Sequence, residues 1–260
     1  MASGWDCHVH VFDAAAPVQA GHYQPVDRPL PQIEAAAAAQ GVGHLVLVQP
    51  SVYGTDNRVL AQALGRAPGR HRGVAVVDPA ITDADLAALH AAGVRGVRFN
   101  LVSPVGCARA DVPLQLRALA PRLRALGWHV QWYAEASDLA DIAGWQQETG
   151  LTFVLDHLAG LRAGVTAPAA LQALAQQGAW IKLSGWYRLD AAFPYDALDV
   201  HVAWVAERFG ERMVWGSDWP HTSFAPQNMP AYASVWQPLP RVLGAERAAA
   251  VLRAGTVLYA

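Results

Sequence analysis

The chain of 260 residues is 53% hydrophobic and 15% charged, which excludes a disordered protein and is enough for one large core. Its net charge of -2, without any lysine- and arginine-rich run, argues against nucleic acid as a partner. Membrane spans need roughly 20 apolar residues, and no such stretch is present. The N-terminus also lacks the apolar segment of a signal peptide, so we expect a cytoplasmic protein.

Short apolar runs alternate with segments rich in alanine and leucine along the whole chain. Eight runs are typical of buried strands: residues 5–12, 44–51, 72–78, 93–101, 129–135, 153–159, 180–186 and 213–220. Helices are expected at residues 31–41, 56–67, 82–92, 113–126, 137–149, 167–178, 196–210 and 229–254. Glycines stand where five of these helices should end: Gly41, Gly93, Gly127, Gly150 and Gly178. The alternation predicts parallel strands joined by right-handed helical connections.

Eight strands in this alternation predict one (β/α)8 barrel over residues 1–260, with its active site at the carboxyl ends of the strands. A closed barrel pairs every strand, whereas an open sheet leaves two edges. The glycine-rich fingerprint of a dinucleotide-binding fold does not follow the first strand, and no linker marks a second domain. Cys7 and Cys107 are too few for a disulfide framework, and we interpret both as small buried apolar residues.

Two histidines lie one residue apart in the first apolar run, WDCHVHVFD. Alternate residues of a strand point to the same side, so His8 and His10 are expected to share one face. Cys7, Val9 and Val11 would then share the other face. Imidazoles are common metal ligands and proton carriers near neutral pH, so the pair points to a functional site. Two hydrogen-bonded polar residues near a strand end would give the same local pattern, and the rest of the chain must decide.

Polar residues interrupt nearly every predicted strand near its carboxyl end, where such barrels carry their chemistry. Besides the two histidines, they are Gln49, Ser51, Tyr53, Thr55, Asp56, Asn57, Arg98, Asn100, Gln131, Tyr133, Glu135, Asp156, His157, Lys182, Ser184, Arg188, Asp218 and His221. A chain that needed only a packed barrel would not repeat this pattern. Asp218 lies in an apolar, tryptophan-rich segment, so we predict that it has cationic or metal partners, or else a raised pKa.

Individual members of this set also have structural interpretations. His157 by itself would more often be a hydrogen-bonded structural histidine. We interpret its neighbour Asp156 as a capping or outward-facing residue on the opposite strand face. Arg98 has no acidic partner on its own strand, so we expect a buried guanidinium whose countercharge comes from a ligand. Three more histidines, at the other end of the barrel, are interpreted as structural: His44, His71 and His90.

Three motifs carry a family resemblance: DCHVHVFD in the first strand, LDHLAG in the sixth and WGSDWPH in the eighth. In this order they resemble the amidohydrolase superfamily. With QPSVYGTDN, GVRGVRFNL and KLSGWYRL, the pattern is similar to the amidohydrolase-2 branch of sugar-lactone and pyrone-dicarboxylate lactonases, over nearly the whole chain. The resemblance implies a hydrolase that acts on the ester bond of a small anionic lactone, and implies that a bound metal is not always required.

Three positions depart from the pattern of these relatives. Binuclear members use a carboxylated lysine at the end of the fourth strand, but FNLVSP contains no lysine, so a bridged two-metal site is not expected. Pyrone-dicarboxylate lactonases carry a second arginine where this chain has Pro104, and an asparagine where it has Ser223. We therefore expect a substrate with one carboxylate rather than two.

The resemblance and the residue chemistry together predict a mechanism. Asp218 would take a proton from the attacking water, and three imidazoles would stabilise the oxyanion: His8, His10 and His157. Arg98 and Arg188 would hold the substrate carboxylate through their guanidinium forks. Four more residues are predicted to contact substrate: Ser51, Tyr53, Gln131 and His221. Three tryptophans near the strand ends are expected to serve mainly in packing: Trp132, Trp186 and Trp219.

The same catalytic set, His8, His10, His157 and Asp218, would also suit a single divalent metal such as zinc, with one position left for water. We favour chemistry without a cofactor. Three other functions stay open: a lactone isomerase, a metal-dependent decarboxylase of the same superfamily, and a non-catalytic binding barrel. The complete set of Asp218 and three histidines argues against the last.

Overall fold

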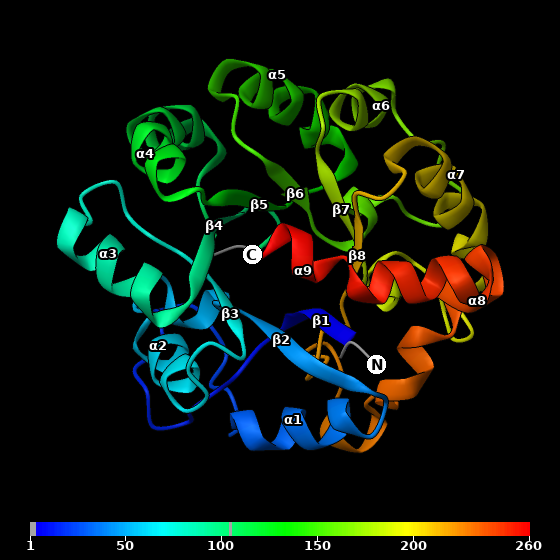
Figure 1. The fold of residues 1–260 in the computed structure, drawn as a ribbon, viewed down its shortest axis with the longest axis horizontal. Helices are drawn as coiled ribbons and strands as arrows, with labels where there is room; N and C mark the ends of the chain where they lie inside the picture. Colours follow the sequence, from blue (N-terminus) through cyan, green and yellow to red (C-terminus); the bar gives the residue numbers. More distant parts are fainter. Residues whose placement is uncertain (1–3, 104–105) are drawn as a thin grey trace.

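The computed structural model describes residues 4–103 and 106–260. Eight parallel strands pair in sequence order and alternate with helices (Figure 1). The strands are β1 (Gly4–Val9), β2 (Val42–Val48), β3 (Arg72–Ala75), β4 (Val94–Asn100), β5 (His129–Tyr133), β6 (Phe153–Leu155), β7 (Trp180–Leu183) and β8 (Met213–Trp215). Backbone hydrogen bonds of 2.8 Å close the barrel between β1 and the segment after β8, from the Asp218 amide to the His8 carbonyl and from the His10 amide to the Trp219 carbonyl. The predicted (β/α)8 barrel is confirmed.

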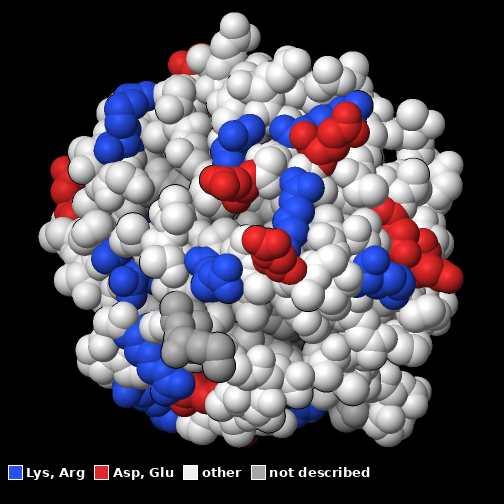
Figure 2. All heavy atoms as spheres, turned by 45° about the vertical axis from the view of Figure 1, so that its right-hand side comes forward, with Lys and Arg blue, Asp and Glu red and all other residues white. Residues whose placement is uncertain are grey.

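Helices surround the barrel, except for the last and shortest, α9, which lies across one end (Figure 1). They are α1 (Leu30–Ala38), α2 (Arg58–Gly65), α3 (Asp83–Ala92), α4 (Val112–Leu126), α5 (Leu139–Thr149), α6 (Ala169–Gln176), α7 (Asp199–Phe209), α8 (Pro238–Arg253) and α9 (Gly255–Leu258). The single helix expected over 229–254 is instead a 3-10 turn at Tyr232–Trp236 followed by α8, which is kinked at Gly244. None of the described helices is long and apolar enough to cross a membrane. On the face shown in Figure 2, positive and negative side chains are interspersed.

Several strands end earlier than the sequence predicts. β6 ends at Leu155 and β8 at Trp215, whereas the apolar runs extend to residues 159 and 220. Just beyond these ends, His157 and Asp218 have positive φ angles of 50° and 61°, which a β-strand does not accommodate. The site residues therefore emerge on turns at the mouth of the barrel, aimed inward by their backbone conformation.

Apolar side chains fill the barrel below the mouth. Trp5, Cys7, Val46, Val48, Val74, Val214 and Tyr259 form this inner cluster, which is separate from the larger core between sheet and helices. The placement of Cys7 corrects our prediction that it shares a face with Val9, which packs in the outer core. The pairing register of β1 shifts between Asp6 and Val9, and this shift breaks the strict alternation of the strand. Cys7 is buried as expected, but Cys107 is only partly buried.

The three histidines assigned to the other end of the barrel make structural contacts. The His44 ring stacks on Trp5, and its Nδ1 atom lies 2.8 Å from the Arg70 carbonyl oxygen. His71 accepts a hydrogen bond from the Leu45 amide, and His90 accepts one from the Trp128 indole.

We predict that His129 makes the protein less stable as the pH falls below 6.5. Its ring is buried against Tyr259, and burial, helped by Lys182, lowers the pKa of His129 to about 3. The unfolded chain therefore binds a proton near pH 6.5 that the folded chain cannot bind. Between pH 6.5 and pH 5 this costs roughly 1–2 kcal/mol of unfolding free energy.

Urea unfolding of the wild type and of His129→Leu at both pH values measures this contribution. The variant should lose less stability than the wild type over the same interval. Equal losses in the two proteins would show that His129 is not responsible.

Candidate active site

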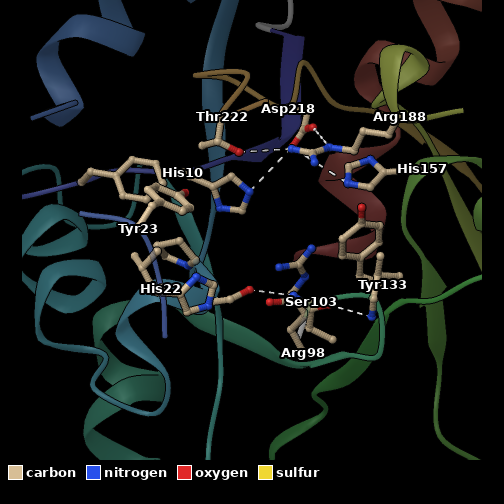
Figure 3. A pocket seen from close by; sticks show the side chains of 16 residues that line it. His10, His22, Tyr23, Arg98, Ser103, Tyr133, His157, Arg188, Asp218 and Thr222 are labelled. Carbon is tan, nitrogen blue, oxygen red and sulfur yellow. Dashed lines mark hydrogen bonds and ion pairs between the residues drawn. The ribbon is translucent and has the colours of Figure 1, made fainter. Parts of the chain in front are cut away.

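A pocket of about 200 Å³ opens at the carboxyl ends of the strands (Figure 3). Its walls are His10, Phe12, His22, Tyr23, Pro50, Ser51, Val52, Arg98, Asn100, Val102, Ser103, Tyr133, His157, Arg188, Asp218 and Thr222. The His8 ring lies beside those of His10 and His157, with ring centres 5.0 Å and 4.8 Å apart. The structure thus brings together the four residues predicted to be catalytic.

Asp218 occupies the centre of this group. Its Oδ2 atom accepts two hydrogen bonds of 2.6 Å, from the Tyr187 hydroxyl and from Arg188 Nε. Its Oδ1 atom has no hydrogen bond among the described residues and faces three imidazole Nε2 atoms. These belong to His8 at 3.6 Å, His10 at 3.6 Å and His157 at 3.9 Å. One carboxylate oxygen is therefore held in place while the other remains available to a ligand.

Asp218 is ionised at neutral pH. Burial is the largest single influence and would raise the pKa of Asp218, but the Arg188 guanidinium and the neighbouring histidines together outweigh it. The net effect holds the pKa of Asp218 well below its usual range. Of the two outcomes predicted for this carboxylate, the structure shows the cationic partner and not the raised pKa.

Two of the histidines around Asp218 are neutral, because burial lowers the pKa of His157 to about 4 and that of His8 well below its usual value. The Nδ1 atom of His10 lies 2.8 Å from the carbonyl oxygen of Val48. A carbonyl can only accept, so this Nδ1 carries a proton, and in a singly protonated ring the Nε2 atom presents a lone pair. The Nδ1 atom of His157 lies 2.9 Å from the Ser184 hydroxyl.

Two glycines allow the imidazoles to pack this closely. Gly185 has a φ of 61°, and a Cβ atom there would lie 2.3 Å from His157 Nδ1. A Cβ atom on Gly216 would lie 2.5 Å from the Cβ atom of His8. The glycines in KLSGWYRL and WGSDWPH thus make room for the site.

Asp156 is completely buried beneath the pocket, which corrects our interpretation of it as a capping or outward-facing residue. Its Oδ2 atom accepts hydrogen bonds from Arg98 Nε at 3.1 Å and Gln131 Nε2 at 3.0 Å. Its Oδ1 atom lies 3.2 Å from His8 Nδ1 and 3.4 Å from Lys182 Nζ. Because β6 has already ended at Leu155, strand alternation does not apply to Asp156, and the residue turns inward.

The expectation that Arg98 has no acidic partner is wrong, because Asp156 from another strand end pairs with its Nε atom. The two Nη atoms of Arg98 make no hydrogen bond with any residue described by the structure, and the guanidinium points into the pocket beside Tyr133 (Figure 3). Arg188 is paired with Asp218, and its Nη atoms lie 3.3 Å from Ser223 Oγ and 3.4 Å from Thr222 Oγ1.

The other predicted substrate contacts divide into two groups. Ser51 lines the pocket and accepts a hydrogen bond of 2.6 Å from Asn100. The other three do not line it: the Tyr53 hydroxyl bonds to the backbone of Asp13, Gln131 belongs to the network around Asp156, and His221 is buried with its ring 5.6 Å from that of Tyr187. Pro104 lies outside the described residues.

The three tryptophans predicted to serve in packing do so. Trp132 stacks on Phe99, Trp186 donates to the Val235 carbonyl, and Trp219 is buried. None of the three lines the described pocket.

Sequence reasoning missed several residues of the site. Tyr187 donates a hydrogen bond to Asp218. In the sequence, its place directly before Arg188 in KLSGWYRL was the one indication that it belongs to the site. His22 and Tyr23 line the pocket from the loop between β1 and α1, for which the sequence predicted no element. Lys182 was noted as a polar strand residue but was given no role, although it is fully buried at the Asp156 network.

Comparison with known proteins agrees with this geometry. A family model described as amidohydrolase matches residues 5–254. The chain belongs to the amidohydrolase family. This amidohydrolase is 36% identical over 245 residues to a 2-pyrone-4,6-dicarboxylate hydrolase of Comamonas testosteroni, which covers 85% of the chain and 77% of the relative. It is also 31% identical over 236 residues to a 4-sulfomuconolactone hydrolase of Rhizobium radiobacter. That match covers 87% of this chain and 79% of the relative.

A solved structure from Pseudomonas putida, assigned as a 2-pyrone-4,6-dicarboxylic acid hydrolase, has a TM-score of 0.88 to this amidohydrolase. The two share 30% sequence identity, and the match covers 99% of this chain and 97% of the other. The family resemblance predicted from the sequence motifs is therefore confirmed.

The donor types around Asp218 suit a divalent metal. His8, His10 and Asp218 offer ligand atoms within 4.8 Å of one another, and the same spacing is found for His8, Asp156 and His157. Two imidazoles and a carboxylate are a common ligand set of catalytic zinc. Each imidazole must present a lone pair to the metal, which the hydrogen bond to Val48 secures for His10.

We predict that Gly185→Ala destabilises the protein more than Gly127→Ala. Both glycines have similar positive φ angles, 61° and 66°, so an alanine side chain strains the backbone similarly at both. A Cβ atom at residue 127 meets nothing within 4 Å, whereas one at residue 185 displaces the His157 ring. Such overpacking typically costs an additional 1–3 kcal/mol or so. Urea unfolding measures the difference, and equal losses would contradict the close packing of His157 on Gly185.

Proposed function

We propose that this amidohydrolase opens small carboxylated lactones by adding water to the ring carbonyl. The observation that carries the proposal is the Oδ1 atom of ionised Asp218, which has no hydrogen bond with the residues that the structure describes and faces three imidazoles in a pocket whose opposite wall is the Arg98 guanidinium (Figure 3). The lactone hydrolases among its relatives support this reaction class.

In the proposed reaction, a water molecule held at Asp218 Oδ1 gives its proton to that oxygen while its own oxygen bonds to the carbonyl carbon. The carbonyl becomes a tetrahedral oxyanion, which N–H groups of His8 and His157 stabilise. The ring C–O bond then breaks, and the departing alkoxide takes up the proton to give a hydroxy acid. His10 differs from its predicted role at the oxyanion: its Nε2 lone pair accepts a hydrogen bond from the attacking water.

Arg98 is proposed as the anchor for the substrate carboxylate. Its pairing with Asp156 neutralises the buried charge through Nε and leaves both Nη atoms for a bidentate contact. Arg188 plays a secondary part, because its Nε atom already keeps Asp218 ionised and its Nη atoms face Thr222, which lines the pocket, and Ser223. Within the described part of the chain, the Arg98 guanidinium offers two Nη atoms without a hydrogen bond, which fits the expectation of a single substrate carboxylate.

A divalent metal such as zinc would be held by His8, His10, His157 and Asp218 once the Nε2 atom of each ligating histidine carries no proton, and when bound would polarise water as a Lewis acid. The proposed steps use only the side chains. Assays with and without a chelator, with detection of the proton released, test the reaction class. Hydrolysis of a lactone adds a carboxylate and releases a proton, isomerisation releases none, and decarboxylation releases carbon dioxide.

Asp218→Asn is expected to lower the rate of lactone hydrolysis by about 10²–10⁴-fold, because the amide cannot take the proton from water. Asp190→Asn is the matched control. Asp190 also has a positive φ, 57°, and also pairs with an arginine, Arg162, but it is exposed and away from the pocket. The control should retain wild-type activity. A folded Asp218→Asn protein with near-normal turnover would exclude Asp218 as the base.

Arg98→Met is expected to weaken the hydrolysis of carboxylated lactones by about 10- to 100-fold in kcat/KM, corresponding to a lost hydrogen-bonded ion pair of ~1.5–3 kcal/mol. Neutral lactones of the same ring size serve as the control substrates, because they make no ionic contact with residue 98. The ratio of the two kcat/KM values measures the effect independently of any general loss of stability. An unchanged ratio would contradict the anchoring role of Arg98.

A further inference from the structure

A lysine lies deep in the barrel, beneath the pocket. Lys182, on β7, is completely buried, and its Nζ atom lies 2.7 Å from Gln131 Oε1, 3.4 Å from Asp156 Oδ1 and 3.4 Å from His8 Nδ1. An ammonium group has three N–H donors and no acceptor. Gln131 Oε1 and His8 Nδ1 lie in hydrogen-bonding geometry to Nζ, whereas Asp156 Oδ1 supplies the countercharge at ion-pair distance, so His8 Nδ1 accepts from one of the ammonium N–H groups.

The orientation of the neighbouring groups supports this assignment. Gln131 donates its amide N–H to Asp156 Oδ2 at 3.0 Å, which turns its carbonyl oxygen towards Lys182. Asp156 Oδ1 is 3.2 Å from His8 Nδ1 but makes no hydrogen bond of suitable geometry with it. The Nδ1 atom of His8 thus has hydrogen-bonding geometry towards the lysine and not towards the carboxylate.

We infer that Lys182 is a positioning residue that fixes the proton of His8 on Nε2. A neutral imidazole carries one proton, so an Nδ1 atom that accepts from Lys182 leaves the proton on Nε2. His10 is held in the opposite tautomer, because its Nδ1 atom donates to the Val48 carbonyl. The two histidines of β1 therefore present opposite groups to Asp218 Oδ1, a donor from His8 and an acceptor from His10, each at 3.6 Å.

The opposite tautomers give His8 and His10 separate roles in the reaction. These roles rest on the proposed function. Addition of water to a carbonyl needs a donor for the oxyanion and an acceptor for the water. His8 supplies the first and His10 the second. A protonated Nε2 atom cannot ligate a metal, so Lys182 also opposes metal binding by His8, although the donor types at the site suit zinc.

Histidine nitrogens labelled with ¹⁵N test the tautomers without any substrate. Long-range ¹H–¹⁵N correlation spectra distinguish a proton on Nδ1 from one on Nε2, and the loss of signals in His8→Gln and His10→Gln assigns the two rings. We expect an Nε2–H pattern for His8 and an Nδ1–H pattern for His10. An Nδ1–H pattern for His8 would overturn the inference, and the result stands whether or not the enzyme hydrolyses lactones.

The Lys182→Met variant tests whether Lys182 determines the tautomer of His8. Methionine keeps the length and apolar stem of lysine but donates no hydrogen bond, so His8 Nδ1 is left facing Asp156 Oδ1, and its proton should move to Nδ1. The Nε2 lone pair of His8 then joins that of His10. We expect the tautomer of His8 to change and the affinity for zinc, measured by competition with a chelating dye, to rise at least about tenfold.

Arg98→Met is the matched control for the tautomer and for zinc affinity. It removes another cation from Asp156 without contacting His8, so both properties should stay as in the wild type. An unchanged His8 tautomer in folded Lys182→Met, or the same change in Arg98→Met, would refute the role of Lys182. Should Lys182→Met fail to fold, the spectrum of the wild type still decides whether His8 carries its proton on Nε2.

Discussion

The buried carboxylate of Asp156 is the contact on which the site depends most. It lies at the carboxyl end of β6 and is shared by Arg98 of β4, Gln131 of β5 and Lys182 of β7, with His8 of β1 beside it. A buried ion pair that loses one partner typically costs about 3–5 kcal/mol, because the remaining charge is left unpaired. Asp156 therefore makes the positions of four strand ends depend on one another before any substrate enters.

A second carboxylate fixes the seam where the barrel closes. Asp6 accepts hydrogen bonds from the backbone amides of His8 and Ser217, and from the Tyr232 hydroxyl. One side chain thereby joins β1, the turn that carries Asp218, and the segment before α8. The hydrogen bonds of Asp6, together with the one from the Asp218 amide to the His8 carbonyl, set the distance between His8 and the carboxylate of Asp218.

The sequence was sufficient for features that depend on local pattern. Alternating apolar runs and helices predicted the barrel, and polar residues at strand ends predicted that His8, His10, His157 and Asp218 meet. It was insufficient where the outcome depends on register between strands. Arg98 pairs with Gln131 across β4 and β5, and this register brings both near Asp156, which no single segment reveals. The inward placement of Cys7 follows from a register shift in β1, which is equally invisible in one strand read alone.

The closed lower end of the barrel has a consequence for the passage of molecules. Tyr259 fills the interior below the site, α9 lies across that end (Figure 1), and arginines of β3 and β4 bond to the carbonyls of Tyr259 and Ala260. Substrate and product therefore use the same pocket entrance, between the loops that carry His22, Tyr23 and Thr222. A ring-opened acid carries one more negative charge than its lactone and must leave past Arg98 and Arg188. The product therefore leaves against the attraction of both guanidinium groups, along the same route that admits the next substrate.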